Sequence, residues 1–345
     1  RAAMGASSSK PSYSWAGFLF GQALGASAYT RAVAFPRVDA DFRGRRYVVT
    51  GGSSGIGRAV ATALFLRGAT VHILCRDLAR GERAVAEIEQ LRDGTRDDQG
   101  GALRAHCVDC GKPLELRRFA DEVFSDGTAC DGLVNNAGAL LTRRVLVDGL
   151  ESHVACHVIG LHALTKFLRP ALERASRERP GRVHVVNVAS AGLYTARLDM
   201  PALLDGFAVV EEADGSYDVA LVYAVCKRAQ LELTQRWARE LSESGITVSC
   251  MHPGWAKTDG LEGLFELYPS YEQWYESFRK AEDGADTIVW LLAQEGIEPG
   301  NFWFDREVTS EHQWFAGTYS TAEEQQALWQ WCEDETTARA GAEQP

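Results

Sequence analysis

Thr50-Gly51-Gly52-Ser53-Ser54-Gly55-Ile56-Gly57 is the stretch that decides the fold of this 345-residue chain. The apolar run Tyr47-Val48-Val49 precedes it and a helical pattern follows it. Glycines allow a tight turn and a close approach of backbone to pyrophosphate, and a helix N-terminus offers unpaired N–H groups. A glycine-rich turn without a ligand is the plain alternative. Strand, turn and helix in this order favour dinucleotide binding, and we predict phosphate contacts from Gly51, Ser53, Ser54, Gly55, Ile56 and Gly57.

The alternation of strand and helix patterns continues from this turn to residue 304. Apolar, β-branched runs predict strands near 45–50, 69–75, 102–108, 130–135, 182–189, 245–251 and 300–304. Amphipathic stretches predict helices near 56–67, 77–92, 112–125, 145–173, 219–243 and 281–294. Such alternation is typical of a parallel sheet covered by helices on both faces. We therefore predict an α/β protein with a doubly wound parallel sheet, a Rossmann fold of about seven strands.

Four segments stand outside this alternation. We expect the Rossmann domain to span 42–305, with a helical N-terminal extension at 1–41 and a C-terminal tail at 306–345. Within the tail, Ala322–Cys332 predicts a short helix, whose neighbouring aromatic residues pack on the core or on a partner. Within the domain, 192–218 and the aromatic stretch 265–278 follow the carboxyl ends of strands, so we expect them to form substrate walls.

Composition narrows the class of protein. Hydrophobic residues make up 46% and charged residues 24%, which is ordinary for a soluble globular protein. The net charge of −11 argues against nucleic acid as the main ligand, because phosphate contacts need clustered Lys and Arg. Eight scattered cysteines indicate reduced thiols in an intracellular protein. Cys107 and Cys110 form a C-x-x-C pair without a second ligand pair at a suitable spacing, so we predict no metal site.

The end of the second predicted strand indicates which dinucleotide is bound. A carboxylate there accepts hydrogen bonds from the ribose of NAD, whereas an arginine accommodates the 2′-phosphate of NADP. Cys75 stands where the carboxylate is expected, and Arg76 follows it. This favours NADP(H) over NAD(H). The alternative is an exposed Arg76 that pairs with Asp77.

The segment Tyr223-Ala-Val-Cys-Lys227 lies early in the predicted helix 219–243. A spacing of four residues places the phenol and the ammonium on one helical face. A nearby cation stabilises a phenolate and lowers the pKa of a tyrosine. Taken alone, the Y-x-x-x-K pattern is common. The plain alternative is a helical tyrosine that packs on the methylene chain of the lysine.

In combination the motifs are specific. The turn at 50–57 is followed in order by Asn135-Asn136-Ala137-Gly138, Ser190, the Tyr223–Lys227 pair and Pro253-Gly254-Trp255-Ala256-Lys257-Thr258. This order resembles the short-chain dehydrogenase/reductase family over residues 42–305. The stretches Met251–Ala256, Gly284–Thr287 and Phe304–Arg306 indicate a closer likeness to one particular member of that family.

The resemblance implies a role for each matching residue. Tyr223 exchanges a proton with the substrate oxygen, Lys227 hydrogen-bonds the nicotinamide ribose and keeps the tyrosine acidic, and Ser190 polarises the carbonyl. Hydride passes between nicotinamide C4 and the carbonyl carbon, while the protein supplies positioning and electrostatics. Besides Tyr223 and Lys227, the implied cofactor-binding residues are Asp109, Asn136, Ala137 and Gly138 on the adenine side and Pro253, Gly254, Trp255 and Thr258 at the nicotinamide amide.

Two departures from the family pattern concern turnover and substrate. Alignment on Gly160 and Thr165 places His157 where family members usually carry an asparagine that holds a water of the proton relay. Histidine can serve the same water, but it is larger and can carry a charge. The number of residues between Ser190 and Tyr223 is also larger than is usual in the family. The insertion 192–218 accounts for the excess, and we expect it to reshape the substrate pocket.

The N-terminal segment favours contact with something beyond the Rossmann domain. Residues 1–38 contain four bases and no acid, and 11–30 carry no charge. Gly17, Gly21 and Gly25 form a stripe that lets another helix approach closely. Three interpretations fit: a helix packed on this chain or on a partner, a membrane-bound helix, and an organellar targeting sequence. The last predicts a mitochondrial protein, and without it we expect a cytoplasmic one.

Two functional hypotheses follow. The first is an NADP(H)-dependent oxidoreductase that interconverts a carbonyl and an alcohol, with a bulky apolar substrate suggested by the aromatic stretch 265–278. The second is a catalytically weak or inactive subunit of a larger, membrane or organellar assembly, favoured by His157 and the glycine stripe. Fold alone does not establish either function. Family resemblance makes homo-oligomers plausible, with 145–173 and 219–243 as the faces expected to meet.

Overall fold

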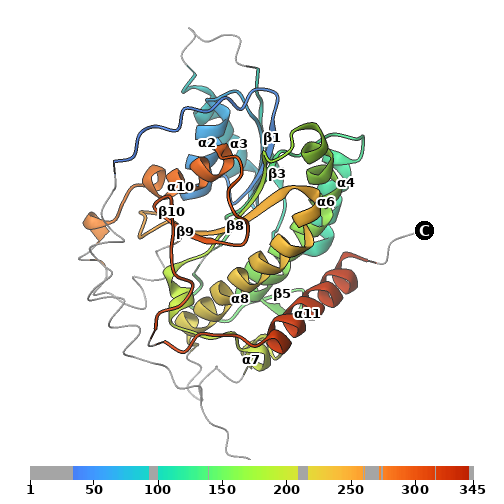
Figure 1. Ribbon diagram of the computed structural model, residues 1–345, viewed down its shortest axis with the longest axis vertical. Helices are drawn as coiled ribbons and strands as arrows, with labels where there is room; N and C mark the ends of the chain where they lie inside the picture. The colour runs from blue at the N-terminus through green and yellow to red at the C-terminus, as the bar shows by residue number, and fades with distance from the viewer. Residues whose placement is uncertain are drawn as a thin grey trace, which may run out of the picture.

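The computed structural model describes residues 34–92, 100–138, 140–208, 217–258, 260, 272, 275–314 and 316–341. Its main sheet has eight strands in the order β10-β9-β8-β7-β4-β1-β2-β3 (Figure 1). The first four in the chain are β1 (Arg46–Thr50), β2 (Thr70–Cys75), β3 (Leu103–Cys107) and β4 (Gly132–Asn135). The others are β7 (Val183–Val188), β8 (Ile246–His252), β9 (Phe302–Phe304) and β10 (Glu307–Val308).

The predicted doubly wound sheet is confirmed. Seven strands run parallel, and β10 adds an antiparallel edge against β9. The chain moves outward from β1 to β2 and β3, then returns to lay β4 on the other side of β1. This reversal creates a crevice at the carboxyl ends of β1 and β4, the place where sheets of this kind bind ligands.

The central strands are buried along their whole length because helices cover both faces. Every residue of β7 and of β8 is buried, as is expected of central strands in a parallel sheet. One core contains residues from α2 (Gly55–Phe65), α3 (Leu78–Glu89) and α10 (Ala281–Ala293). The opposite core contains residues from α4 (Pro113–Phe124), α6 (Leu161–Glu178) and α8 (Val219–Glu240).

The expectation of one helix over 145–173 is wrong at its start. Leu146–Val147 (β5) and Leu150–Glu151 (β6) pair as a small antiparallel hairpin. Asp148 and Gly149 form its turn with φ of 49° and 83°, the left-handed backbone that an Asp-Gly pair supplies. A short helix, α5 (Ser152–Val154), and a π-helical turn, Ala155–Gly160, then lead into α6. The turn signal outweighs the amphipathic pattern at this place.

The insertion after Ser190 contains two short helices. A 3₁₀ turn spans Ala191–Tyr194, and α7 spans Met200–Leu204. Asp199 caps α7 by accepting a hydrogen bond from the Ala202 N–H. Residues 209–216 lie outside the described part of the chain, so the insertion is followed only on either side of them.

The C-terminal tail forms a longer helix than expected. It is α11 (Ala322–Ala340), and a reciprocal pair of hydrogen bonds between Thr321 and Glu324 caps its start. The Trp329 ring packs on Trp237 of α8 and on His162 of α6, with ring centroids 4.9 and 4.8 Å apart. The tail aromatic therefore packs on this chain, and α11 lies along two of the helices we expected to face another subunit (Figure 1).

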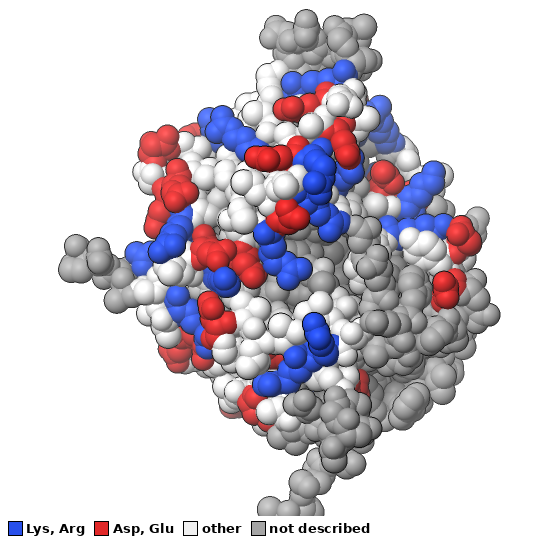
Figure 2. Space-filling model, turned by 180° about the vertical axis from the view of Figure 1, so that it is seen from behind, with Lys and Arg blue, Asp and Glu red and all other residues white. Residues whose placement is uncertain are grey.

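Several sequence-based expectations concern residues outside the described ranges. These are the helix at 11–30 and most of the aromatic stretch 265–278. Within the ranges that are described, no helix combines the length and the hydropathy needed to span a membrane. On the face drawn in Figure 2, acidic and basic side chains of the described residues are interspersed rather than gathered by sign.

Candidate active site

The glycine-rich turn is tied to the segment that follows β4. Gly51 has a φ of 65°, and its N–H donates to the Leu74 carbonyl at 2.8 Å. The Thr50 hydroxyl oxygen accepts the N–H groups of Asn136 and Ala137 at 2.9 and 2.8 Å. The Asn136 amide donates to the Thr50 carbonyl at 2.9 Å. The turn and the segment Asn136–Gly138, predicted separately, therefore form one rigid unit.

Close packing explains why glycine occupies the turn. A Cβ at Gly57 would lie 2.4 Å from the Gly51 carbonyl oxygen and 2.5 Å from the Asn136 amide nitrogen, which is too close for any side chain. A Cβ at Gly55 would lie 3.1 Å from the Thr258 side chain, so the far end of the segment Pro253–Thr258 reaches the turn. Ser54 is the N-cap residue of α2, but its side chain accepts no hydrogen bond from the helix. The N–H groups of the first turn are therefore not bound by the Ser54 side chain.

The end of β2 and the residues after it are the part of the structure that bears on the choice of dinucleotide. Cys75 is buried, and its thiol donates to the carbonyls of Asp77 and His106 at 3.3 and 3.6 Å. Burial raises the pKa of the Cys75 thiol, so it offers no negative charge to a ribose. Asp77 caps α3 by accepting from the Arg80 N–H at 3.0 Å. Arg76 is exposed, and no ion pair joins it to Asp77 among the described residues.

Ser190, Tyr223 and Lys227 converge at the carboxyl ends of β7 and β8. Ser190 follows β7, and its hydroxyl oxygen accepts the Gly192 N–H at 3.2 Å. The space beside the Gly192 Cα lies 3.5 Å from the Tyr223 ring and 3.6 Å from the Ser190 hydroxyl oxygen, so the two side chains face the same small region. The Lys227 ammonium lies 5.3 Å from the centroid of the Tyr223 ring.

Lys227 is held by partners that sequence reasoning missed. Its side chain is buried, and its ammonium donates to the Val188 carbonyl and to the Gln230 amide oxygen, both at 2.9 Å. An ammonium has three protons, so these two bonds leave one for a further acceptor. Gln230 stands three residues after Lys227 on α8, a spacing that could have pointed to the contact.

His157 lies in the π-helical turn, beside the catalytic tyrosine candidate. Its imidazole is 1% exposed, and Nε2 lies 2.7 Å from the position of a Cβ at Gly138. Burial, with the charge of Lys227, lowers the pKa of His157 well below its usual value, so the ring is neutral near pH 7. No hydrogen-bond partner for Nδ1 stands among the described residues. The expected histidine is therefore at the site as an uncharged ring.

Glu151 and His153 form a buried pair next to this histidine. The Glu151 carboxylate accepts from the His153 ring at 2.8 Å and from the N–H groups of His153 and Val154 at 2.8 and 3.0 Å. Burial alone would raise the pKa of Glu151, but these hydrogen bonds outweigh it and the pKa is lowered. The His153 ring lies 5.8 Å from that of His157. The sequence offered no signal for Glu151, because the hairpin that ends in it was read as helix.

Another predicted cofactor residue, Asp109, follows β3. Its Oδ1 accepts the Gly111 N–H at 2.9 Å, and its own N–H donates to the Glu115 carboxylate at 2.8 Å. Asp109 is half-buried, so its carboxylate is oriented by the turn and still reaches the surface. Among the described residues, no group of three His, Cys, Asp or Glu side chains is arranged to hold a metal.

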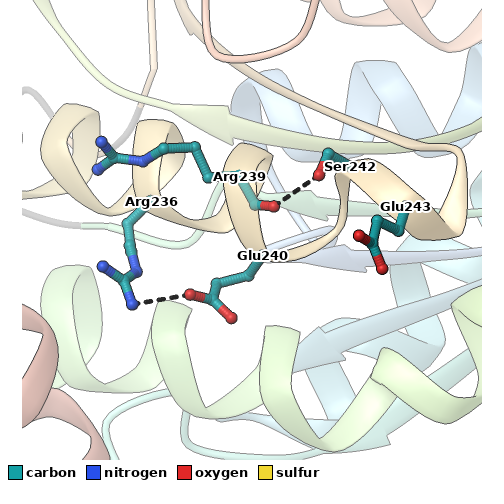
Figure 3. Close-up of a pocket in the computed structure, with 5 residues that line it drawn as sticks. All are labelled: Arg236, Arg239, Glu240, Ser242 and Glu243. Atoms are coloured by element: carbon teal, nitrogen blue, oxygen red, sulfur yellow. Dashed lines mark hydrogen bonds and ion pairs between the residues drawn. The ribbon is translucent and has the colours of Figure 1, made fainter.

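A separate hollow of about 320 Å³ lies at the carboxyl end of α8 (Figure 3). Its lining consists of Arg236, Arg239, Glu240, Ser242 and Glu243. Arg236 pairs with Glu240 at 2.8 Å, and the Ser242 hydroxyl donates to the Arg239 carbonyl at 2.8 Å. This hollow precedes β8, at the amino edge of the sheet, whereas dinucleotide sites form at the carboxyl edge. It plays no part in the candidate site.

Comparison with known proteins agrees with this geometry. Residues 45–197 match the family model described as short chain dehydrogenase. Dehydrogenase/reductase SDR family member 12 of Bos taurus is 35% identical over 291 residues, which are 83% of this chain and 84% of the relative. This is the family member to which the stretches at 251–256, 284–287 and 304–306 pointed.

Two further likenesses are more distant. Retinol dehydrogenase 12 of Bos taurus is 28% identical over 276 residues, covering 79% of this chain and 81% of the relative. The crystal structure of a short chain dehydrogenase from Burkholderia cenocepacia J2315 in complex with NADP is 26% identical, with a TM-score of 0.55 over 76% of this chain and 96% of that one.

Proposed function

The chain belongs to the short-chain dehydrogenase/reductase family, and from that premise we propose that it is an NADP(H)-dependent oxidoreductase that interconverts a carbonyl and an alcohol. The observation that carries the proposal is the convergence of Ser190 and Tyr223 on the space beside Gly192, with the Lys227 ammonium 5.3 Å from the tyrosine ring. An acid, a cation and a hydroxyl donor around one small space are what carbonyl reduction needs.

The residues around the crevice suit a dinucleotide. The turn has no room for side chains at Gly51 and Gly57, so its backbone can approach a pyrophosphate. The first turn of α2 adds N–H groups and the positive end of its dipole. Gly51, Ser53, Ser54, Gly55, Ile56 and Gly57 would hold the phosphates, with Asn136, Ala137 and Gly138 beside them.

The chemistry divides between cofactor and protein. A bound nicotinamide supplies or accepts the hydride at its C4. In the reducing direction, Tyr223 gives its phenolic proton to the substrate oxygen as the carbonyl carbon becomes that of an alcohol, and the resulting phenolate regains a proton from solvent. Lys227 stabilises the phenolate by its charge and uses its third proton for the nicotinamide ribose. Ser190 donates a hydrogen bond to the same substrate oxygen and orients it.

NADP(H) is the proposed cofactor, with NAD(H) as the less favoured one. The neutral Cys75 thiol and the exposed Arg76 support this choice, because a guanidinium binds a phosphate through paired, charge-assisted hydrogen bonds. A solved relative in complex with NADP is consistent with it. Pro253, Gly254, Trp255 and Thr258 would meet the nicotinamide amide, and Asp109 the adenine.

We propose a bulky apolar alcohol or carbonyl compound as substrate. Leu193 and Tyr194 lie in the 3₁₀ turn that Ser190 opens, and they are buried in an apolar cluster with Phe302. The name of one relative is retinol dehydrogenase 12, which fits a lipid-like substrate class.

A catalytically weak subunit of a larger assembly is the alternative, and His157 favours it. A buried, neutral imidazole fills the place where family members usually carry an asparagine and a water. In this alternative the nucleotide site persists as architecture. Contact with a membrane or a protein partner through residues 11–30, a mitochondrial location and homo-oligomer formation are further proposals, which fractionation of chains with and without residues 1–38 would test.

The first experiment is a fluorescence titration of the full chain with NADPH and with NADH, followed by energy transfer from its nine tryptophans. We expect tight, saturable binding of NADPH and weaker binding of NADH, followed by oxidation of NADPH in a screen of apolar aldehydes and ketones. Binding without any turnover across the screen would favour the weak-subunit alternative. Absence of binding to both dinucleotides would contradict the proposed function.

A further inference from the structure

Three stretches that set this chain apart within its family meet at one place in the fold. They are Gly284–Thr287 at the start of α10, Phe304–Arg306 at the end of β9, and Met251–Ala256 at the end of β8. We propose that Arg279 and Asp305 are positioning residues for the segment Pro253–Thr258 and, through it, for the nicotinamide end of the cofactor. The cofactor part of this inference rests on the proposed function.

Arg279 holds the segment at three successive points. Its N–H donates to the Trp255 carbonyl and its carbonyl accepts the Lys257 N–H, both at 2.9 Å, which makes a parallel β-bridge with Ala256. Its guanidinium Nη1 donates to the Pro253 carbonyl at 3.4 Å. Since backbone and side chain of one residue both bind the segment, a shift of Arg279 moves the segment.

Asp305 fixes the Arg279 guanidinium in place. The pair is bidentate, with Nη1 to Oδ1 at 2.7 Å and Nη2 to Oδ2 at 3.2 Å. The Arg279 side chain is 2% exposed and that of Asp305 is 16% exposed. Removal of one partner from a buried pair leaves the other charge uncompensated, so the arginine needs this carboxylate in order to stay where it is.

The turn that carries Asp305 is itself under strain. Asp305 and Arg306 are the two central residues of the β9–β10 hairpin, with φ of 49° and 63°. Two positive φ angles are the pattern of a type I′ turn, for which Asn-Gly or Asp-Gly is preferred. An arginine at the second position is unfavourable, because side chains disfavour left-handed backbone. Such strain persists where the surroundings hold it, and it often marks a functional arrangement.

Further contacts hold this turn in place. The Arg306 guanidinium donates to the Asp286 carboxylate of α10 at 2.7 and 2.6 Å. The ring of Phe304 lies between His252 and the Arg279 guanidinium, with centroid distances of 5.1 and 5.3 Å. The turn is therefore clamped between α10 and the end of β8, and its geometry directs Asp305 to Arg279.

The same unit reaches the phosphate-binding turn. A Cβ at Gly284 would lie 3.2 Å from the Ala256 side chain and 3.3 Å from that of Ile56, so α10 packs closely on both. The opposite end of the segment meets Gly55 through Thr258. Arg76 and Asp109 lie beyond this unit, after β2 and β3. Disturbance of Asp305 should thus affect the nicotinamide end of the cofactor and spare its adenosine end.

A matched pair of variants isolates the carboxylate. Arg306→Gly removes the unfavourable side chain and keeps a left-handed backbone, and it also removes the two hydrogen bonds to Asp286, a loss that both chains of the pair share. Asp305→Asn with Arg306→Gly keeps the same favourable turn and differs only by an amide in place of the carboxylate. Two ligands are titrated against each full-length chain: NADPH, and adenosine 2′,5′-bisphosphate, a fragment that lacks both the nicotinamide half and the pyrophosphate linkage. We expect the double variant to bind NADPH about tenfold more weakly than the Arg306→Gly chain does, and to bind the fragment equally well.

Amide hydrogen exchange without cofactor provides the second measurement. The Lys257 and Arg279 amides, which form the bridge, should exchange faster in the double variant than in the Arg306→Gly chain. Equal loss of both ligands would reveal general destabilisation and overturn the inference, and so would unchanged NADPH affinity. If the unaltered chain binds neither ligand, the proposed function fails, and exchange alone then decides the positioning role: unchanged exchange overturns it. Should the double variant not fold, Arg279→Lys, which loses the bidentate fork, is compared with the unaltered chain in the same way.

Discussion

The imidazole of His157 meets the phenol ring of Tyr223 edge to face, with ring centroids 5.7 Å apart and planes at 79°. This contact places a bulky, neutral and buried side chain against the proposed proton donor. Because the pKa of His157 is far below its usual value, the ring neither repels Lys227 nor donates a proton at physiological pH. We therefore expect the His157 ring to affect turnover through its size and its hydrogen bonds, and not through a charge.

His157→Asn should raise turnover. The smaller amide leaves room for a water beside Tyr223 and Gly138, which opens a path for the proton that the phenolate regains. We expect kcat to rise by up to about tenfold, at the low end of the effects of proton transfer, with unchanged NADPH affinity. Steady-state kinetics with one aldehyde substrate measures both. A fall in kcat would show that the imidazole itself takes part in the proton path.

Tyr223→Phe should abolish turnover without affecting cofactor binding. The ring and its packing stay, while the proton donor is lost, so we expect kcat to fall by at least about 10³-fold. NADPH affinity, measured by tryptophan energy transfer, should stay within about twofold, since the ribose contact is assigned to Lys227. Tyr319→Phe, at an exposed tyrosine stacked on His312, is the matched control and should leave kcat unchanged. Residual activity equal to that of the control would remove Tyr223 from the chemistry.

Arg76→Ala should discriminate between the two dinucleotides. Loss of a charge-assisted contact to the 2′-phosphate is expected to weaken NADPH binding by about 10- to 100-fold, whereas NADH, which lacks that phosphate, should lose less than about twofold. Arg83→Ala, at an exposed arginine of α3, is the control for general loss of positive charge. Equal losses of NADPH and NADH would assign Arg76 to another role.

Glu333→Gln should destabilise the docking of α11 in a pH-dependent way. Hydrogen bonds from His162 at 3.1 Å and Lys166 at 2.5 Å lower the pKa of Glu333 from 4.5 to about 2, although partial burial opposes them. Burial also keeps His162 neutral, so Lys166 supplies the charge of the pair. A carboxyl group with a depressed pKa stabilises the fold above its unfolded pKa, and this contribution disappears as the pH falls from 4.5 towards 2.

We therefore expect Glu333→Gln to lower the free energy of unfolding by about 1–2 kcal/mol at pH 7, a value reduced for the partial exposure of the pair. The difference from the unaltered chain should shrink as the pH drops below 4.5. Urea unfolding at pH 7 and at pH 4 measures it. Asp334→Asn, at the exposed neighbour on the same helix, should change stability by less than about 0.5 kcal/mol at either pH. A difference that is constant with pH would exclude the ionised carboxylate as its source.

The parts of this protein that the sequence by itself determined are those encoded in short stretches. The glycines at 51, 55 and 57 predict a tight turn between strand and helix, because glycine alone fits the backbone there. The valine-rich sequence of β7 predicts a strand that is buried on both faces. The spacing of Tyr223 and Lys227 predicts that both side chains lie on one face of a helix. These features depend on local sterics and periodicity, so the doubly wound sheet follows from them.

Only the tertiary structure decided which distant residues meet. Lys166 and Glu333 stand 167 residues apart, and their contact exists because α11 folds back over α6 and α8. Arg279 and Asp305 come from a loop and a hairpin turn, whose pairing depends on how β8, β9 and α10 assemble. The residues before α6 form a hairpin despite their helical pattern, because β5 and β6 pair with each other. Contacts of this kind arise from packing between elements, and no periodicity along the chain records them.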